Sequence, residues 1–449
     1  MSPTTIAAAS AALDAGTTTS RALVEDCLER ISDPAGEGAR VFLRVYATEA
    51  RAQADAMDGL RRVGRAPGPL AGIPISLKDL LDVAGETTAA ASVVLADAPP
   101  AIGHAPVVAR LLAAGLVPVG RTNMTEFAYS GLGLNPHHGT PANPFDRARP
   151  RIPGGSSSGA AVSVTDGMAF VGIGTDTGGS CRIPAALCGI VGFKPTQRRV
   201  PLAGALPLSP SLDSIGPLGR TVACCAAVDA VLAGAPPPPS PLDSVAGRRF
   251  VVPSGGWRNG LEPAVEAAFA AALARLRGAG ALVEGRAIRQ LAAVNEANAR
   301  GTLANAEAWV WHETLLARAG ERYDPFVRSR IERGSTMTAA DIVQVLDARR
   351  RLIGEMAAGW ADCDAVVMPT CPLTAPPIAA LLADPALASQ VNFAVLSAPS
   401  AINFLDGCSI SLPCHEPGAA PVGLMLSAGP MGDANLLRLA AAVEALLGR

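Results

Sequence analysis

The sequence predicts an α/β protein in which helices cover both faces of a central sheet. Segments with strand-like patterns alternate along the chain with segments of helical spacing, an arrangement typical of α/β domains. Hydrophobic residues make up 49% of the 449 residues and charged residues only 17%, so the chain can bury a large core. The length allows one large domain or two or three ordinary ones. We find no internal repeat.

The N-terminal segment is expected to be helical. Over residues 1–60 the apolar side chains recur at helical spacing, for example at Leu23, Cys27, Leu28 and Ile31. A run of threonine and serine precedes this pattern, as is common where a helix begins.

Strand-like segments follow the N-terminal helices. Apolar residues alternate with other residues over 73–78, which predicts a strand that places Lys78 opposite its apolar face. Residues 105–120 predict a helix, a break at Gly115 and then a strand. The apolar run at 168–174 suits a buried strand, and it leads into a glycine-rich turn.

The second half of the chain continues the alternation. Helical patterns occupy residues 262–279, and a further helix begins at a capping box formed by Thr338 and Asp341. Residues 364–370 predict a strand. The proline-rich stretch 235–241 is too short for an independent spacer, so we expect an exposed surface loop there.

Charge and composition argue against a nucleic-acid-binding, membrane or secreted protein. The formal net charge is −2, which gives no electrostatic footprint for nucleic acid or an anionic membrane. Neither a signal peptide nor a run of about 18 apolar residues is present. The nine cysteines form no C-x-x-C pair, which favours a reducing compartment. We expect a cytoplasmic protein whose cysteines, including Cys181, are mostly small core residues.

Lysine is rare in this chain. Of the 37 Lys and Arg residues only Lys78 and Lys194 are lysine, so arginine fills nearly every cationic position. Arginine keeps its proton near neutral pH, whereas a desolvated lysine can lose it. The two lysines are therefore candidates for positions that require an amine, with retention by chance as the alternative.

Three short segments carry residues suited to nucleophilic catalysis: 76–79, 153–161 and 174–184. A serine nucleophile needs a base within hydrogen-bond reach and backbone N–H groups aimed at the developing oxyanion. Ser180 directly follows two glycines, which permit a tight turn that exposes successive N–H groups. The glycine and serine run at 153–161 could also be a flexible linker, but small apolar residues follow it at once.

A second motif offers a different nucleophile. Residues 155–159 match G-x-S-x-G, the nucleophile elbow of α/β-hydrolases, which would make Ser157 the nucleophile. That hypothesis requires a strand immediately before the motif and a histidine late in the chain. The preceding segment does not have a strand pattern, and the late histidines are His312 and His415.

Taken together, the three segments resemble the amidase signature family. The likeness extends to residues 120–128, 192–196, 213–222, 409–414 and 421–429, so it covers most of the chain. It implies one α/β/α domain spanning residues 1–449 around a large mixed sheet.

The resemblance also implies a role for each motif residue. Ser180 would attack the carbonyl carbon, Ser156 would pass the proton, and Lys78 would accept it as a neutral base. The oxyanion hole would use the N–H groups of Thr177, Gly178, Gly179 and Ser180. The peptide bond before Ser156 would be cis. We expect Asp176 and Arg182 to hold the loop, and Lys194 to be structural.

The resemblance implies neither a metal nor an organic cofactor. A Ser-His-Asp triad is the commoner arrangement in hydrolases, but none of the five histidines lies in a motif that we can connect to Ser180. The pair His137 and His138 has no matching ligand cluster, and adjacent side chains point apart.

The leading hypothesis is a stand-alone amidase that cleaves a carboxamide C–N bond and releases ammonia or an amine. It would act on a small-molecule amide, alone or as a homodimer. The alternatives are the A subunit of a tRNA-dependent amidotransferase, which frees ammonia from glutamine for a partner, and a catalytically silent binding protein. Candidate substrate-binding residues are Met124, Tyr129, Ser130 and the segment 323–334, within which Arg330 resembles the carboxylate-binding arginine of glutamine-using members.

Overall fold

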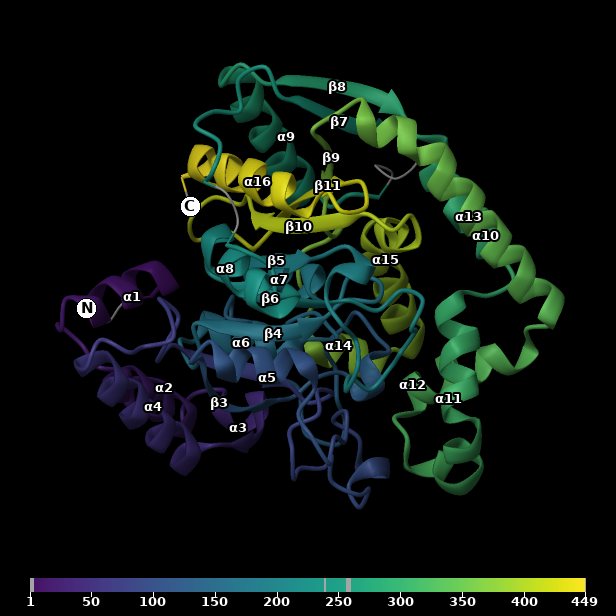
Figure 1. Ribbon diagram of the computed structural model, residues 1–449. Helices are drawn as coiled ribbons and strands as arrows, with labels where there is room; N and C mark the ends of the chain where they lie inside the picture. Colours follow the sequence, from purple (N-terminus) through teal and green to yellow (C-terminus); the bar gives the residue numbers. More distant parts are fainter. Residues whose placement is uncertain (1–3, 238–239, 256–259, 449) are drawn as a thin grey trace.

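A single mixed sheet forms the centre of the protein. The computed structural model describes residues 4–237, 240–255 and 260–448. Within these ranges the strands join in one 11-stranded sheet, ordered β1-β3-β2-β4-β6-β5-β10-β11-β9-β7-β8 (Figure 1). The strands are β1 (Phe42–Val45), β2 (Pro74–Lys78), β3 (Val117–Thr122), β4 (Val171–Thr175), β5 (Val191–Lys194), β6 (Ile215–Gly219), β7 (Arg249–Ser254), β8 (Leu282–Ala287), β9 (Ala365–Pro369), β10 (Cys408–Pro413) and β11 (Gly423–Ala428).

The pairing pattern decides which strand ends meet. Strand β2 lies parallel to both of its neighbours, β3 and β4, and β7 lies parallel to β8 and β9. The remaining pairs are antiparallel. Since β2 and β4 run side by side in the same direction, their carboxyl ends, which carry Lys78 and Thr175, reach the same edge of the sheet.

Helices surround the sheet. They are α1 (Ile6–Asp14), α2 (Ser20–Ser32), α3 (Gly38–Val41), α4 (Ala47–Arg62), α5 (Pro106–Ala113), α6 (Ser158–Thr165), α7 (Arg182–Cys188), α8 (Val222–Ala233), α9 (Pro263–Gly278), α10 (Arg289–Ala297), α11 (Leu303–Ala319), α12 (Pro325–Glu332), α13 (Ala339–Ala361), α14 (Ile378–Ala383), α15 (Pro385–Phe404) and α16 (Asp433–Leu447).

These helices cover both faces, as the sequence predicts. Strand β10 contacts α7 and α16, which pack with different neighbours: α7 with α6 and α15, and α16 with α8 and α9. Large buried apolar clusters fill the space between the sheet and the helices. Helices α10 to α13 lie along one side of the molecule, where α10 packs on α15 and α13 (Figure 1).

Most of the elements expected from the sequence are confirmed. Helix α2 buries Leu23, Cys27, Leu28 and Ile31 on one face. The region 105–120 forms α5 and β3 with a left-handed residue at Gly115 between them (φ +80°). The capping box at the start of α13 is present, because the side chains of Thr338 and Asp341 each bind the other's backbone N–H.

Two expected strands differ in detail from the structure. Every residue of β2 is buried, so the face of the strand that carries Lys78 is as buried as the apolar face opposite it. Strand β4 begins at Val171, three residues after the start of the apolar run at 168–174. An alternating pattern in the sequence does not show whether one face of a strand is buried or both are. Here both are buried, because helices cover both faces of the sheet.

The proline-rich stretch 235–241 lies partly outside the described residues, which exclude 238–239. Pro236, Pro237, Ser240 and Pro241 are exposed or partly exposed, as expected for a surface loop. Because the strands of the described ranges all belong to one sheet, we propose that residues 1–449 form a single domain. No helix in these ranges is both long enough and apolar enough to span a membrane.

Candidate active site

Lys78 lies at the end of β2 with its side chain fully buried. Its Nζ donates hydrogen bonds to Ser156 Oγ at 2.7 Å and to Thr175 Oγ1 at 2.8 Å. Burial penalises the charged ammonium and lowers the pKa of Lys78 to about 7, although the carboxylates of Asp176 and Asp213 offset part of this effect. Near neutral pH this lysine can therefore act as a base.

Thr175 was not singled out from the sequence. It is the last residue of β4, and the parallel pairing of β2 with β4 brings its hydroxyl to Lys78. Its place directly before the glycine-rich turn is the one sequence signal that could have identified it.

Ser156 lies in the loop that precedes α6. The peptide bond between Gly155 and Ser156 is cis, as the resemblance implies. Ser156 is fully buried, and its carbonyl accepts a hydrogen bond from the Thr125 N–H at 3.1 Å. The next residue, Ser157, donates its N–H to the Ser180 carbonyl at 3.3 Å, so the loop with Ser156 and the turn with Ser180 lie against each other.

Ser180 lies on the turn between β4 and α7, and it lines a cavity of about 940 Å³ together with Thr177 and Gly178. Within the described ranges its hydroxyl has no hydrogen-bond partner. The described residues therefore include no hydrogen bond between the Ser180 and Ser156 hydroxyls. Catalytic hydrogen bonds are often longer without substrate than with it.

A buried ion pair holds the turn. Arg182 donates to both carboxylate oxygens of Asp176, at 3.0 and 2.9 Å, and both side chains are fully buried. Asp176 also accepts the N–H groups of Gly179 at 2.8 Å and Cys181 at 3.1 Å. Burial alone would raise the pKa of Asp176, but Arg182 more than offsets it and holds that pKa well below its usual range. This arrangement matches the loop-holding role expected for the pair.

The N–H groups on the turn differ in availability. The Gly179 N–H is directed at Asp176, so it is already used within the turn. Among the described residues, no group accepts a hydrogen bond from the N–H of Thr177, Gly178 or Ser180. These three donors therefore have no acceptor within the described residues, and the residues that carry them line the cavity.

The cavity has a polar wall formed by α11, α12 and the residues around Tyr129. Tyr129, Ser130 and Arg330 all line it. The Arg330 guanidinium lies 4.8 Å from the centre of the Tyr129 ring, and its Nε donates to the Tyr129 carbonyl at 2.9 Å. The Tyr129 hydroxyl accepts a hydrogen bond from Asn305 Nδ2 at 2.6 Å. Met124 does not line the cavity. It is fully buried and belongs to the largest apolar cluster of the core.

The competing nucleophile does not have the geometry of an elbow. The residues before Ser157 are all described, and no strand directly precedes it. Its buried hydroxyl donates a hydrogen bond to the Thr175 carbonyl at 3.3 Å. The late histidines are also used elsewhere: His312 pairs with the Tyr323 hydroxyl at 2.9 Å, and His415 Nδ1 accepts the Val422 N–H at 3.3 Å. Ser157 therefore belongs to the frame that supports the cavity.

The other residues singled out from the sequence have structural surroundings. Lys194 is buried and donates to the Pro195 carbonyl at 2.7 Å. His137 Nε2 lies 2.9 Å from Glu126 Oε1. Among the described residues no three His, Cys, Asp or Glu side chains converge as metal ligands would. The nine cysteines all lie in the described ranges, where none forms a disulfide and eight are buried. Burial raises the pKa of the Cys181 thiol.

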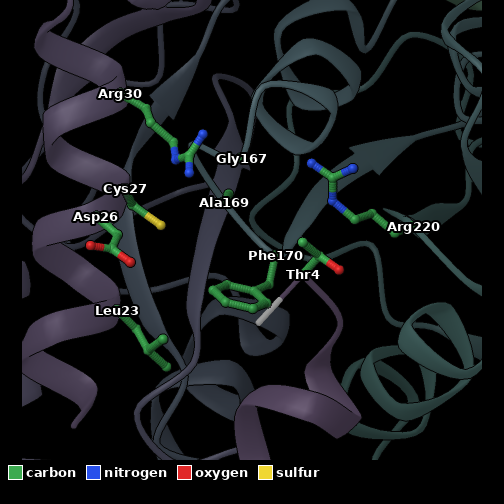
Figure 2. A pocket seen from close by; sticks show the side chains of 9 residues that line it. All are labelled: Thr4, Leu23, Asp26, Cys27, Arg30, Gly167, Ala169, Phe170 and Arg220. Atoms are coloured by element: carbon green, nitrogen blue, oxygen red, sulfur yellow. The ribbon is translucent and has the colours of Figure 1, made fainter. Parts of the chain in front are cut away.

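A second, smaller cavity of about 90 Å³ lies apart from Lys78 and Ser180. It is lined by residues of α2, among them Cys27 and Arg30, and by Phe170 and Arg220 (Figure 2). The Arg220 guanidinium donates to the carbonyls of Val164 and Thr165, which end α6. This cavity therefore contains none of the residues expected to react.

Comparison with known proteins identifies the family of the chain. A family model described as Amidase matches residues 22–437. The chain is 36% identical to a 2-amino-5-chloromuconic acid deaminase of Comamonas testosteroni, over 89% of this chain and 87% of the relative. It is 35% identical to the A subunit of a glutamyl-tRNA(Gln) amidotransferase from Chloroflexus aurantiacus, over 98% and 96% of the two chains.

Solved structures of amidases are also similar to this chain. A crystal structure of an amidase superposes with a TM-score of 0.88 at 33% identity, covering 98% of this chain and 99% of that one. The peptide amidase of Stenotrophomonas maltophilia superposes with a TM-score of 0.78 at 28% identity, covering 99% and 97%. The chain therefore belongs to the amidase signature family, and it is a hydrolase that acts on amides.

Proposed function

We propose that the chain hydrolyses a carboxamide through an acyl-enzyme, with Ser180 as nucleophile, Ser156 as proton relay and Lys78 as base. The observation that carries the proposal is the hydrogen bond from the buried Lys78 Nζ to Ser156 Oγ, at 2.7 Å. A lysine with a pKa of about 7 is substantially neutral at physiological pH, so it can receive a proton.

The reaction has two halves. Ser180 Oγ attacks the carbonyl carbon while its proton passes to Ser156, whose own proton passes to Lys78. The tetrahedral intermediate then collapses, and the leaving nitrogen takes a proton back through Ser156 and departs as ammonia or an amine. Water attacks the acyl-enzyme by the same relay, which releases the carboxylic acid and restores Ser180.

The oxyanion of each tetrahedral intermediate would bind the N–H groups of Thr177, Gly178 and Ser180. They lie on the cavity-lining turn and have no internal acceptor among the described residues. The family resemblance adds Gly179 to this set, but the Gly179 N–H faces Asp176. The proposed oxyanion hole therefore consists of three donors.

The cavity favours an amide that also carries a negative charge. Three arginines, Arg300, Arg330 and Arg333, line it, and its described lining includes no aspartate or glutamate. Among the described residues no carboxylate pairs with Arg330 or Arg333. Because a half-buried guanidinium without a counter-charge is costly, we propose that a substrate carboxylate pairs with Arg330.

The A subunit of an amidotransferase remains the second candidate, because such a relative aligns over nearly the whole chain. It would use the same triad, but its ammonia would pass to a partner protein. The two functions differ in whether the purified chain alone hydrolyses amides other than glutamine.

The nucleophile can be identified with the purified chain and no added protein. A fluorophosphonate probe is expected to label Ser180 alone, and hydrolysis across a panel of small amides is expected to be lost in Ser180→Ala but retained in Ser157→Ala. Peptide mass spectrometry locates the label. Labelling of Ser157 would restore the elbow hypothesis, and activity confined to glutamine would favour the amidotransferase function.

Lys78→Arg is expected to be nearly as inactive as Lys78→Ala, with losses of about 10³-fold or more in kcat. Arginine keeps the positive charge but cannot give up its proton at working pH. In the unmodified enzyme, activity should be low when Lys78 is protonated, rise with pH through about 7, and then level off. Near-normal turnover by Lys78→Arg would rule out the base mechanism.

Arg330→Met is expected to raise KM about 10- to 100-fold for amides with a carboxylate, since a hydrogen bond to a charged group contributes about 1.5–3 kcal/mol. Uncharged amides should be hydrolysed nearly as before. Arg328→Met is the matched control, because Arg328 lies on the same helix, pairs with Glu332 and does not line the cavity. Equal losses for charged and uncharged amides would contradict the assignment.

A further inference from the structure

A short turn outside the proposed triad lies directly beside the oxyanion donors. It runs from Leu208 to Asp213, and Leu208 and Leu212 line the same cavity as Ser180. Asp213, at the end of this turn, is buried and is not part of the cavity wall. Its carboxylate therefore acts on the site through other residues and not by touching a ligand.

The two oxygens of Asp213 bind different segments. Oδ1 accepts a hydrogen bond from the Thr177 hydroxyl, while Oδ2 accepts the N–H groups of Leu208 and Ser209, each at 3.0 Å. A carboxylate can fill all of these acceptor positions at once. An amide of the same shape can do so only if its oxygen accepts the two N–H groups and its nitrogen donates to the Thr177 hydroxyl, which reverses that hydrogen bond and removes the charge that strengthens it.

Thr177 is fixed on both sides by the same part of the chain. Its hydroxyl is held by Asp213, and the preceding residue, Asp176, exchanges two backbone hydrogen bonds with Ser214, at 2.8 and 3.1 Å. The Thr177 N–H is left without an acceptor among the described residues and belongs to a turn that lines the cavity. The direction of this N–H is thus set by contacts to residues 213–214.

We infer that Asp213 is a positioning residue for amide hydrolysis, which orients the oxyanion-binding turn by holding the Thr177 hydroxyl. The inference rests on the proposed function, because it assumes that Ser180 attacks and that the Thr177 N–H binds the oxyanion. A donor has its full effect only when it is already aimed at the position of the developing charge. Asp213 fixes the orientation of the Thr177 N–H without contacting substrate.

The same turn is also tied to the helices on the far side of the cavity. Glu307 of α11 accepts hydrogen bonds from the hydroxyls of Ser209 and Ser211 and from the Ser211 N–H. Helix α11 also carries Asn305, which binds the Tyr129 hydroxyl in the polar wall of the cavity. The turn that ends at Asp213 therefore fixes the oxyanion donors relative to the wall that is proposed to bind substrate.

The test compares Asp213→Asn, Thr177→Val and Thr177→Ser by steady-state kinetics on the best amide of the panel. Thr177→Val is expected to lower kcat about 10- to 100-fold with KM changed less than about twofold, because only transition-state stabilisation is lost. Asp213→Asn keeps a weaker, reversed contact and is expected to lower kcat by less. Thr177→Ser keeps the hydroxyl and should retain most of the activity. The double variant Asp213→Asn with Thr177→Val should be no worse than Thr177→Val alone, because both substitutions act on one contact.

A second readout separates positioning from general stability. Affinity for a boronic acid that forms a tetrahedral adduct should fall in parallel with kcat/KM, while affinity for the product carboxylate should not change. Thr196→Val is the matched control: Thr196 forms an equally buried pair with Asp433, at 2.7 Å, away from the cavity. It should lower the melting temperature and leave kcat and boronic acid affinity unchanged.

Full kcat in folded Thr177→Val would overturn the inference, as would a kcat loss without loss of boronic acid affinity. If Asp213→Asn does not fold, the comparison of Thr177→Val with Thr177→Ser decides the question alone. Ser180→Ala distinguishes a failure of the proposed function from a failure of the positioning role. If that variant stays active, the proposed function fails, whereas an inactive Ser180→Ala with a normal Thr177→Val refutes only the positioning role.

Discussion

The chemistry that we propose for this protein depends on one buried amine. Lys78 lies inside the sheet with two hydroxyl groups as its hydrogen-bond partners, and no carboxylate of the described residues contacts it. An ammonium in such a place loses its hydration without gaining a counter-charge, which explains why its pKa falls to about 7. The parallel pairing of β2 with β4 creates this position, because it brings Lys78 and Thr175 to the same edge of the sheet.

The surrounding charges are arranged so that this amine stays unpaired. Asp176 lies on the same turn as Ser180, but its carboxylate accepts hydrogen bonds from Nε and Nη2 of Arg182. Asp213 is also close, yet its oxygens accept from a hydroxyl and two backbone N–H groups. Each carboxylate thus stabilises the shape of the turn, and neither forms an ion pair with Lys78. We regard this division of roles as the reason the site can combine a rigid oxyanion turn with a neutral base.

Local patterns in the sequence identify several residues of the candidate site, but they do not predict which residues contact one another. The strand before Lys78, the double glycine before Ser180 and the small-residue run after Ser156 are local features, and each can be recognised in the sequence. Thr175 and Asp213 cannot, because their importance comes from partners 97 and 36 residues away, which only the folded chain brings together. The position of Met124 could not be predicted for a related reason: an apolar residue near a motif can face either the cavity or the core.

The most direct test measures the protonation of Lys78 itself. The chain contains only two lysines, so selective labelling of lysine side chains with ¹⁵N gives two NMR signals, and the one absent from Lys78→Ala belongs to Lys78. The account predicts that this signal titrates with a midpoint near pH 7 in the folded, active enzyme. A Lys78 that stays fully protonated at about pH 9, well above that midpoint, while amide hydrolysis proceeds at its maximum rate, would contradict it.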